Sequence, residues 1–286
     1  MQITLTDVSV DYRSGPLRTP NVLHAVSAAV RSGSYTAVVG HAGSGKSTLL
    51  KVLSGLLLPR SGTVQIGDQV IRGGVTSKQD WQRIRHKIGL VFQYPETQLF
   101  AETVEQDICF GPLNMGVSLA EAKSLARELI IRVGLDPALL HASPYSLSGG
   151  QKRRTALAGI LAMKPEVLLL DEPGAGLDPE GKMHILDLIH DWHQTYEATT
   201  ILATQDIDDA VRYAEELIIM AEGRIVMQGS ARELLSDPER LTSLQVELPR
   251  ARRLQLRIEA ALRTKLPRVC LTAEELADTL YEAGFA

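Results

Sequence analysis

The sequence predicts an α/β fold with a parallel β-sheet, and three observations carry this prediction. Strand-like and helix-like patterns alternate over residues 166–229, as they do in chains that form parallel sheets. The glycine-rich segment Gly40–Ser47 lies between the apolar run Tyr35–Val39 and the start of a helix. A second apolar run, Val167–Leu170, is followed by two carboxylates, and ligands of such sheets bind at the carboxyl ends of the strands.

Residues 1–39 are expected to form strands. Apolar residues alternate with polar ones near the start of the chain, at Ile3, Leu5, Val8 and Val10. This period of two is typical of a half-buried strand. A turn-rich break is expected over residues 13–20, a hairpin over residues 64–71 and a short helix near Asp80.

Residues 94–165 have a mainly helical pattern and form an insert between two regions of strands and helices. Ser118 and Glu121 have the spacing of a capping box, and the helix that they open is expected to run to Gly134. Strand–helix alternation then returns, and a closing hairpin is expected about residues 222–223.

The segment Gly40–Ser47 satisfies the pattern G-x-x-x-x-G-K-[ST] at every fixed position. Glycines let the backbone approach a phosphate closely, and N–H groups at the start of the next helix point at the anion. Lys46 supplies a positive charge for the β- and γ-phosphates, and the Ser47 hydroxyl is placed to bind Mg²⁺. A turn that binds nothing is the alternative, which the strand–loop–helix context disfavours. The residues expected to hold the nucleotide are Gly40, Gly43, Ser44, Gly45, Lys46, Ser47 and Thr48.

Two carboxylates follow the buried run Val167–Leu170. Asp171 is expected to bind Mg²⁺, directly or through water, and Glu172 is the candidate general base that orients the attacking water. Acidic residues after a strand are often only the start of a solvated loop. The glycine-rich segment that follows another strand of the same predicted sheet favours roles in Mg²⁺ binding and catalysis for these two carboxylates.

The segment Leu147–Gln151 reads Leu-Ser-Gly-Gly-Gln, and Ser148 lies 23 residues before Asp171 (171 − 148). In this order and spacing the chain resembles the ATP-binding cassette (ABC) ATPase family. The resemblance implies a P-loop NTPase fold with a RecA-like parallel sheet core, an antiparallel β subdomain and a helical signature subdomain. It also implies that ATP joins two cassettes, because the signature of one subunit faces the γ-phosphate bound by the other. The signature residues that would contact it are Ser148, Gly149, Gly150 and Gln151.

Three further positions acquire expected roles from the resemblance. Tyr12 resembles the aromatic residue that stacks on adenine, although ordinary packing also explains a tyrosine near a strand end. Gln93 resembles the glutamine that contacts Mg²⁺ and senses the membrane partner. Asp178 resembles the loop residue that touches the opposite cassette, and with Pro179 after it it is also a good helix start.

The chain departs from the family pattern at Gln205, where the family has a histidine that contacts the γ-phosphate and positions the water. Glutamine forms hydrogen bonds but carries neither a proton nor a positive charge. ATP binding is therefore expected to survive while hydrolysis is slow, either in a naturally weak site or through a substitution made to trap the ATP state. Lys46, Glu172 and Gln205 form the expected catalytic set. Gly174, where the family usually has threonine, is expected to have little chemical consequence.

The segments Val91–Phe100 and Thr103–Pro112 resemble the ATPases of energy-coupling factor (ECF) importers of vitamins and metal ions. The resemblance implies a short helix after Gln93 whose acidic residue receives an arginine from a transmembrane coupling subunit. Glu96 and Glu102 are the candidates, with an ordinary surface charge as the alternative for each. The other implied partners are a second ABC ATPase and a separate substrate-binding membrane subunit. The chain looks closer to the second type of ECF ATPase, so a heterodimer is expected and a homodimer is possible.

An ATPase subunit that couples cassette dimerisation to micronutrient uptake is thus the leading hypothesis. A cassette with a weakened hydrolytic site and the ATPase of another ABC transporter class are the alternatives. A cassette acting in translation or DNA repair is disfavoured, because a second cassette and a coiled coil are missing. The formal net charge of −4 gives no electrostatic support for binding nucleic acid.

The composition favours a peripheral protein at the cytoplasmic face of the cell membrane. No apolar stretch approaches the ~20 residues that span a bilayer, and the N-terminus has neither the basic start nor the apolar region of a signal peptide. The two cysteines, Cys109 and Cys270, lie in unrelated segments, which favours reduced thiols. Any membrane role is therefore expected to depend on a partner.

Two domains are expected, a cassette over residues 1–230 and an extension over residues 231–286. Within residues 250–265 three apolar side chains recur at helical spacing, at Leu254, Ile258 and Leu262. Such a basic amphipathic helix can bind a membrane or nucleic acid, but a packed helix with a solvated face is the favoured interpretation. The resemblance suggests that the extension helps to hold two cassettes together.

Overall fold

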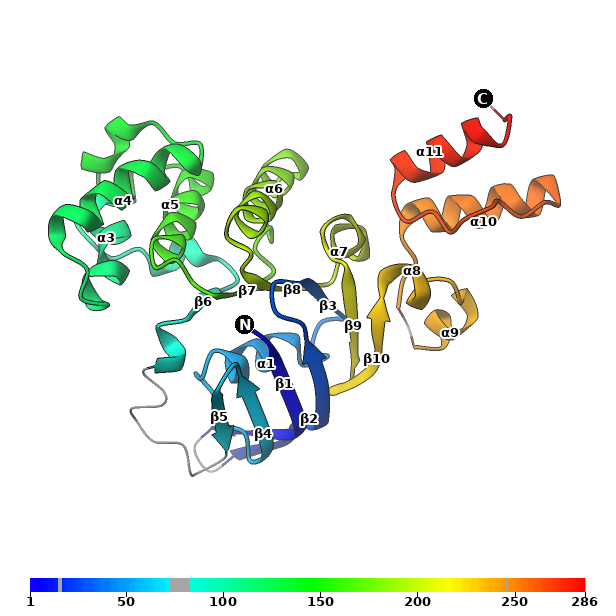
Figure 1. The fold of residues 1–286 in the computed structure, drawn as a ribbon, viewed down its shortest axis with the longest axis horizontal. Helices are drawn as coiled ribbons and strands as arrows, with labels where there is room; N and C mark the ends of the chain where they lie inside the picture. The colour runs from blue at the N-terminus through cyan, green and yellow to red at the C-terminus, as the bar shows by residue number, and fades with distance from the viewer. Residues whose placement is uncertain (15–16, 73–82, 245, 286) are drawn as a thin grey trace.

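The computed structural model describes the backbone of residues 1–14, 17–72, 83–244 and 246–285, and their side chains except those of residues 12–21 and 243. Two β-sheets and the helices around them make up the fold (Figure 1). The larger sheet has the strand order β10-β9-β3-β8-β7-β6, and all its neighbours are parallel except β10 with β9. Its strands are β3 (Tyr35–Val39), β6 (Ile88–Val91), β7 (Val167–Asp171), β8 (Thr199–Thr204), β9 (Glu216–Ala221) and β10 (Arg224–Ser230). The predicted α/β fold with a parallel sheet is confirmed.

Both faces of the larger sheet are covered. On one face, β3 packs against helices through Tyr35, Ala37 and Val39. On the other face, its Val38 belongs to the core shared with α1 and the second sheet. Successive side chains of a strand point to opposite faces, and every residue of β3 is buried. This double burial explains why the strand is a continuous apolar run.

The smaller sheet is antiparallel, with the order β2-β1-β4-β5. It consists of β1 (Ile3–Ser14), β2 (Leu17–Val30), β4 (Ser61–Ile66) and β5 (Gln69–Arg72). The break expected over residues 13–20 is wrong, because β1 and β2 stay paired as far as Ser14 opposite Leu17. Strand pairing uses backbone groups, so polar residues continue the ladder as well as apolar ones. The short helix expected near Asp80 falls outside the described residues.

The helices fall into groups around the larger sheet. Helix α1 (Lys46–Leu53) lies between the two sheets, and α6 (Pro179–Tyr196) and α7 (Ile207–Tyr213) lie on the opposite face (Figure 1). The region expected to be mainly helical contains η1 (Pro95–Gln98), α3 (Val104–Asn114), α4 (Leu119–Arg132), η2 (Pro137–His141), η3 (Pro144–Ser146) and α5 (Gly149–Leu161). Ser118 caps α4 as expected, since its hydroxyl accepts the N–H of Glu121 at 3.3 Å.

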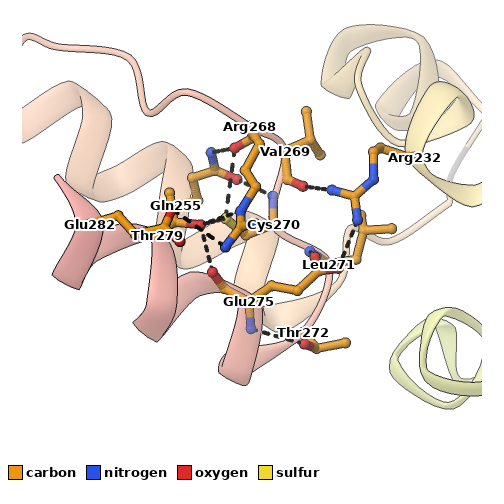
Figure 2. A network of polar contacts seen from close by, with 10 residues as sticks. All are labelled: Arg232, Gln255, Arg268, Val269, Cys270, Leu271, Thr272, Glu275, Thr279 and Glu282. Carbon is orange, nitrogen blue, oxygen red and sulfur yellow. Dashed lines mark hydrogen bonds and ion pairs between the residues drawn. The ribbon is translucent and has the colours of Figure 1, made fainter.

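The C-terminal segment continues from β10 into α8 (Ala231–Leu234), α9 (Pro238–Ser243), α10 (Arg250–Leu262) and α11 (Ala273–Glu282). A polar network connects α10, α11 and the loop between them (Figure 2). The buried Gln255 amide donates to Arg268 O at 2.7 Å and accepts the N–H of Cys270 at 2.8 Å, and Arg268 Nε donates to Thr279 Oγ1 at 2.7 Å.

The packed face of α10 differs from the one that its leucines indicate. Leu254 and Leu262 are 50% and 41% exposed, whereas Arg252 and Gln255 are buried. The Gln255 hydrogen bonds turn this side of the helix toward residues 266–271, which leaves the leucines facing outward.

Candidate functional site

The phosphate loop joins β3 to α1, and its glycines meet strict geometric demands. Gly43 and Gly45 have φ angles of 81° and 106°, in the left-handed region that favours glycine. A Cβ on Gly40 would lie 2.2 Å from the carbonyl oxygen of Met220. The loop therefore curls against β9 in a path that larger residues at these positions would not allow.

The loop also holds a cation and donor groups suited to an anion. Lys46 is buried, and its Nζ donates to the carbonyl oxygens of Gly40 and His41 at 2.7 and 3.1 Å. The Ser44 hydroxyl is buried without a partner among the described residues, and no side chain caps the N-terminus of α1. Burial lowers the pKa of Lys46, while Glu172 and Asp171 oppose that shift. A cation, a free hydroxyl and an uncapped helix start together suit a polyphosphate.

Asp171 and Glu172 lie at the carboxyl end of β7, beside the start of α1. The Ser47 hydroxyl donates to Asp171 Oδ1 at 2.9 Å, so two of the three expected Mg²⁺ ligands are adjacent. Burial raises the pKa of Asp171, opposed by the hydrogen bond from Ser47. Gln93 follows β6, the neighbour of β7 in the sheet, and is exposed.

The side chains of this site suit Mg²⁺ only when a bound nucleotide supplies further oxygen atoms. Across the described residues, no group of three His, Cys, Asp or Glu side chains could hold a metal ion alone. Mg²⁺ commonly uses one or two carboxylates with waters and substrate phosphates. Ser47, Asp171 and Gln93 supply oxygen atoms of this kind, so they fit Mg²⁺ that arrives with a nucleotide.

Glu172 has an unusual backbone and an unpaired oxygen. Its φ of 48° is left-handed, a conformation that is costly for a residue with a Cβ and that often marks functional sites. Its N–H donates to Ala203 O at 3.0 Å, and its Oε1 is buried and has no hydrogen-bond partner in the part of the chain that the structure describes. Burial raises the pKa of Glu172, opposed by Lys46 and by hydrogen bonds from Gln205. The carboxylate thus has one oxygen ready to accept a proton or a water.

The signature residues form the start of α5. Ser148 and Gln151 complete a capping box, because each side chain accepts the backbone N–H of the other at 3.3 and 2.9 Å. Nothing lies within 4 Å of a Cβ built on Gly149 or Gly150. Gly150 and Asp178, the N-cap of α6, line the same hollow of about 420 Å³. The structure therefore brings the signature and the loop of Asp178 to one open surface.

Tyr12 lies in β1, where it pairs with Thr19, and its side chain is outside the described set. Gln205 follows β8 and is exposed, and it contacts Glu172 through its side chain and its backbone. Thr48 is buried in α1. Every expected site residue with a described side chain is thus placed on the phosphate loop, beyond the carboxyl end of a strand or at the helix starts of α1, α5 and α6.

An ion pair that the sequence did not predict connects these regions. The guanidinium of Arg153, on α5, donates to Glu96 Oε2 and Oε1 at 2.9 and 2.8 Å. It also donates to the carbonyl oxygens of Pro173 and Ala175 at 3.3 and 2.7 Å. Only the position of Arg153 next to the signature hinted at a role. Glu96 is therefore held inside the chain, while Glu102 is exposed.

A groove opens beside η1 and α3. Its volume is about 370 Å³, and its lining includes Arg85, Phe100, Asp107, Phe110, Thr155 and Met163. Phe100 and Phe110 are 58% and 50% exposed and meet edge to face with ring centroids 4.8 Å apart. Exposed aromatic rings at the edge of a groove indicate an interaction surface.

Comparison with known proteins gives consistent matches. The family described as ABC transporter matches residues 23–175. The chain is 46% identical over 282 residues to the energy-coupling factor transporter ATP-binding protein EcfA2 of Geobacillus kaustophilus, covering 99% of this chain and 97% of the relative. It is 46% identical over 276 residues to the protein of the same name in Listeria innocua, with 96% of each chain covered.

Two solved structures are similar. That of cbiO1 from Clostridium perfringens, part of the ABC transporter complex cbiONQ, has a TM-score of 0.72 and 32% identity, covering 91% of this chain and 98% of the other. That of the ATP-binding cassette MJ0796, dimeric with ADP and Pi in a post-hydrolysis state, has a TM-score of 0.71 and 28% identity, covering 80% and 99%. No helix in the described part of the chain is long and apolar enough to cross a membrane.

Proposed function

This chain belongs to the ABC transporter ATPase family, and from that premise we propose that it is the ATP-hydrolysing subunit of an ECF-type importer. One observation carries the proposal: Lys46, Ser47, Asp171 and Glu172 converge where β3 and β7 end, in a chain that matches ECF ATP-binding proteins over nearly its full length. Closure of two cassettes on ATP, followed by hydrolysis, would move the membrane partner. The uptake substrate is a vitamin or another micronutrient selected by a separate membrane subunit.

The residues of the site divide the work of hydrolysis. Lys46 and the N–H groups at the start of α1 bind the phosphates, and Tyr12 stacks on the adenine. Ser47, Asp171 and Gln93 would hold Mg²⁺, which shields the phosphate charge when it is bound. Glu172 uses its unpaired oxygen to orient the attacking water and take its proton.

A second ATPase subunit completes the site. The open glycines of the signature leave room at the start of α5 for the γ-phosphate held by that subunit, and Asp178 lies on the same surface. The exposed Leu254 and Leu262 of α10 supply an apolar surface for the extension of the partner. We infer that residues 231–286 form a dimerisation domain beside the cassette of residues 1–230.

A transmembrane coupling subunit is the second partner, and it brings this peripheral chain to the cytoplasmic face of the membrane. The groove beside η1 accepts an apolar helix on Phe100 and Phe110. Glu102 is the acidic residue that we assign to the partner's arginine. Glu102 is favoured over Glu96, because Arg153 already binds both carboxylate oxygens of Glu96.

The docking assignment is tested by a tagged pull-down from detergent-solubilised native membranes. The wild-type chain should recover a second cassette, a larger membrane scaffold and small membrane proteins. Glu102→Arg should recover the second cassette but at least about tenfold less scaffold, because a repelled cation replaces an attractive contact. Quantitative mass spectrometry of the recovered proteins provides the measurement.

Glu128→Arg is the matched control, since Glu128 is exposed on α4 of the same helical region, whereas Glu102 lies two residues after Phe100 of the groove lining. It should recover the scaffold at the wild-type level. Equal recovery with Glu102→Arg would contradict the assignment. A permease paired with an extracellular binding protein, or no membrane protein at all, would overturn the ECF class and leave the ATPase assignment intact.

Gln205 favours a second candidate function, a cassette that binds ATP while its partner performs most of the hydrolysis. Gln205 already contacts the Glu172 carboxylate, so a histidine there would have a proton acceptor beside it. Gln205→His should raise turnover of the assembled complex by about tenfold or more, because an imidazole can carry a proton and a positive charge. Steady-state phosphate release measures this, with Gln205→Asn as the control. An unchanged rate in Gln205→His would remove the weakened-site hypothesis.

A further inference from the structure

Lys182, on the first turn of α6, is bound by two carboxylates from the start of α7. Its Nζ lies 2.8 Å from Asp206 Oδ2 and 2.7 Å from Asp209 Oδ2. Burial alone would lower the pKa of Lys182, but its hydrogen bonds to the two carboxylates, together with their negative charges, outweigh burial and raise the pKa. The lysine therefore stays charged at physiological pH, and the cluster joins two helices that are not connected directly in the sequence.

Asp206 is held through both of its carboxylate oxygens. Oδ1 accepts the N–H of Asp208 at 3.0 Å and caps α7, while Oδ2 accepts from Lys182. The N–H of Asp206 in turn donates to Thr204 Oγ1 at 3.0 Å. Because Gln205 stands between Thr204 and Asp206, the chain is fixed on both sides of it.

The fixed residue lies at the reaction site. Gln205 contacts Glu172 with its side chain and its backbone, and both residues line one cavity of about 260 Å³ with Lys182 and Asp206. The N–H of Lys182 donates to Asp178 O at 2.9 Å. Lys182 is thus joined through its backbone to Asp178 at the start of α6 and through its side chain to Asp206, next to Gln205.

Gly174 gives Lys182 the room to reach Asp206. A Cβ on Gly174 would lie 2.3 Å from Lys182 Cγ and 3.0 Å from Cδ, closer than van der Waals contact. The backbone of Gly174 is not left-handed, so an alanine there would be opposed by the lysine side chain and not by its own conformation. Glycine at this position, which was expected to matter little, therefore has a specific neighbour.

We propose that Lys182 is a positioning residue for ATP hydrolysis, which holds Asp206 and Asp209 across Gly174 and thereby fixes Gln205 beside Glu172. The proposal rests on the proposed ATPase function. Lys182 touches neither the phosphate loop nor the signature in the described contacts, so its effect is on the rate of the chemical step. Misplacing a group at a reaction site costs up to about 100-fold in rate.

Steady-state ATP hydrolysis by the assembled transporter tests this. Lys182→Met should lower kcat about tenfold while the KM for ATP changes less than about twofold, and Lys182→Arg should restore most of the rate. Gly174→Ala should lower kcat to a similar extent. In the Lys182→Met background Gly174→Ala should cause no further loss of kcat, because both substitutions remove the same interaction of Lys182 with the two carboxylates. Asp206→Asn should behave like Lys182→Met.

Asp208→Asn is the matched control, since Asp208 lies on the same helix turn but pairs with Arg250 of α10, at 3.2 Å. It should keep wild-type kcat. Three results would each overturn the proposal. The first is wild-type kcat in Lys182→Met, and the second is an additive loss of kcat when Lys182→Met and Gly174→Ala are combined. The third is an equal loss of kcat in Asp208→Asn and Asp206→Asn.

If the wild-type complex shows no turnover, the proposed function fails and a structural measurement decides this proposal separately. A crystal structure of Lys182→Met with bound ATP should show Gln205 displaced from Glu172 while Lys46 keeps its place. Gln205 in its wild-type position would overturn the positioning role.

Discussion

Glu172→Gln is expected to arrest the protein in an ATP-bound dimer, with turnover at least about 100-fold below wild type. The amide keeps the shape of the side chain but cannot take a proton from water. It also removes a negative charge close to the γ-phosphate, so ATP binding should persist and the closed dimer should accumulate. Phosphate release measures turnover, and light scattering after size exclusion measures the mass of the ATP-bound complex.

Glu166→Gln provides the control, because Glu166 is exposed and pairs with Lys87 at the far end of β7. Its turnover and its ATP-dependent mass should match wild type. Full turnover in Glu172→Gln would refute the general-base assignment. Loss of ATP binding would instead mean that the carboxylate supports the fold of the phosphate loop.

Lys46→Ala is expected to weaken ATP binding by at least about 100-fold. Lys46 is the buried cation of the loop, and within the described part of the chain its Nζ donates hydrogen bonds only to carbonyl oxygens. Hydrogen bonds from a charged group contribute about 1.5–3 kcal/mol each, and 1.4 kcal/mol corresponds to a tenfold change in affinity. Isothermal titration with ATP and Mg²⁺ measures the affinity, and circular dichroism checks that the variant is folded.

Lys265→Ala removes the same charge from an exposed position in the C-terminal segment. It should bind ATP as tightly as wild type, which separates the local contact from the effect of net charge. Binding near the wild-type strength in Lys46→Ala would refute the assignment of the phosphate loop.

The chemistry of the site was predictable because its motifs are contiguous. A loop such as Gly40–Ser47 needs particular residue types at fixed spacing, since one turn of backbone must both curl and present its N–H groups. The pair Asp171-Glu172 needs only a buried strand before it. The sequence therefore predicted the parallel sheet, the phosphate loop and the carboxyl end of β7 without information on distant contacts.

Patterns within one element were less informative where its neighbours decide the outcome. The leucine spacing of α10 indicated its helix but not the side that packs, because Gln255 binds the backbone near Cys270 and turns that side inward. The turn-rich composition of residues 13–20 did not prevent strand pairing, since the ladder uses backbone groups.

The sequence by itself determined the fold class and the local motifs of this protein, and the tertiary structure alone decided how distant side chains pair. Glu96 and Arg153 are 57 residues apart, and Lys182 reaches Asp206 only because Gly174 has no side chain in its path. The physical reason is that a hydrogen bond forms only when the donor–acceptor distance is correct to within a few tenths of an ångström. Such distances are set when the separate strands and helices pack together, and no single segment of sequence contains them.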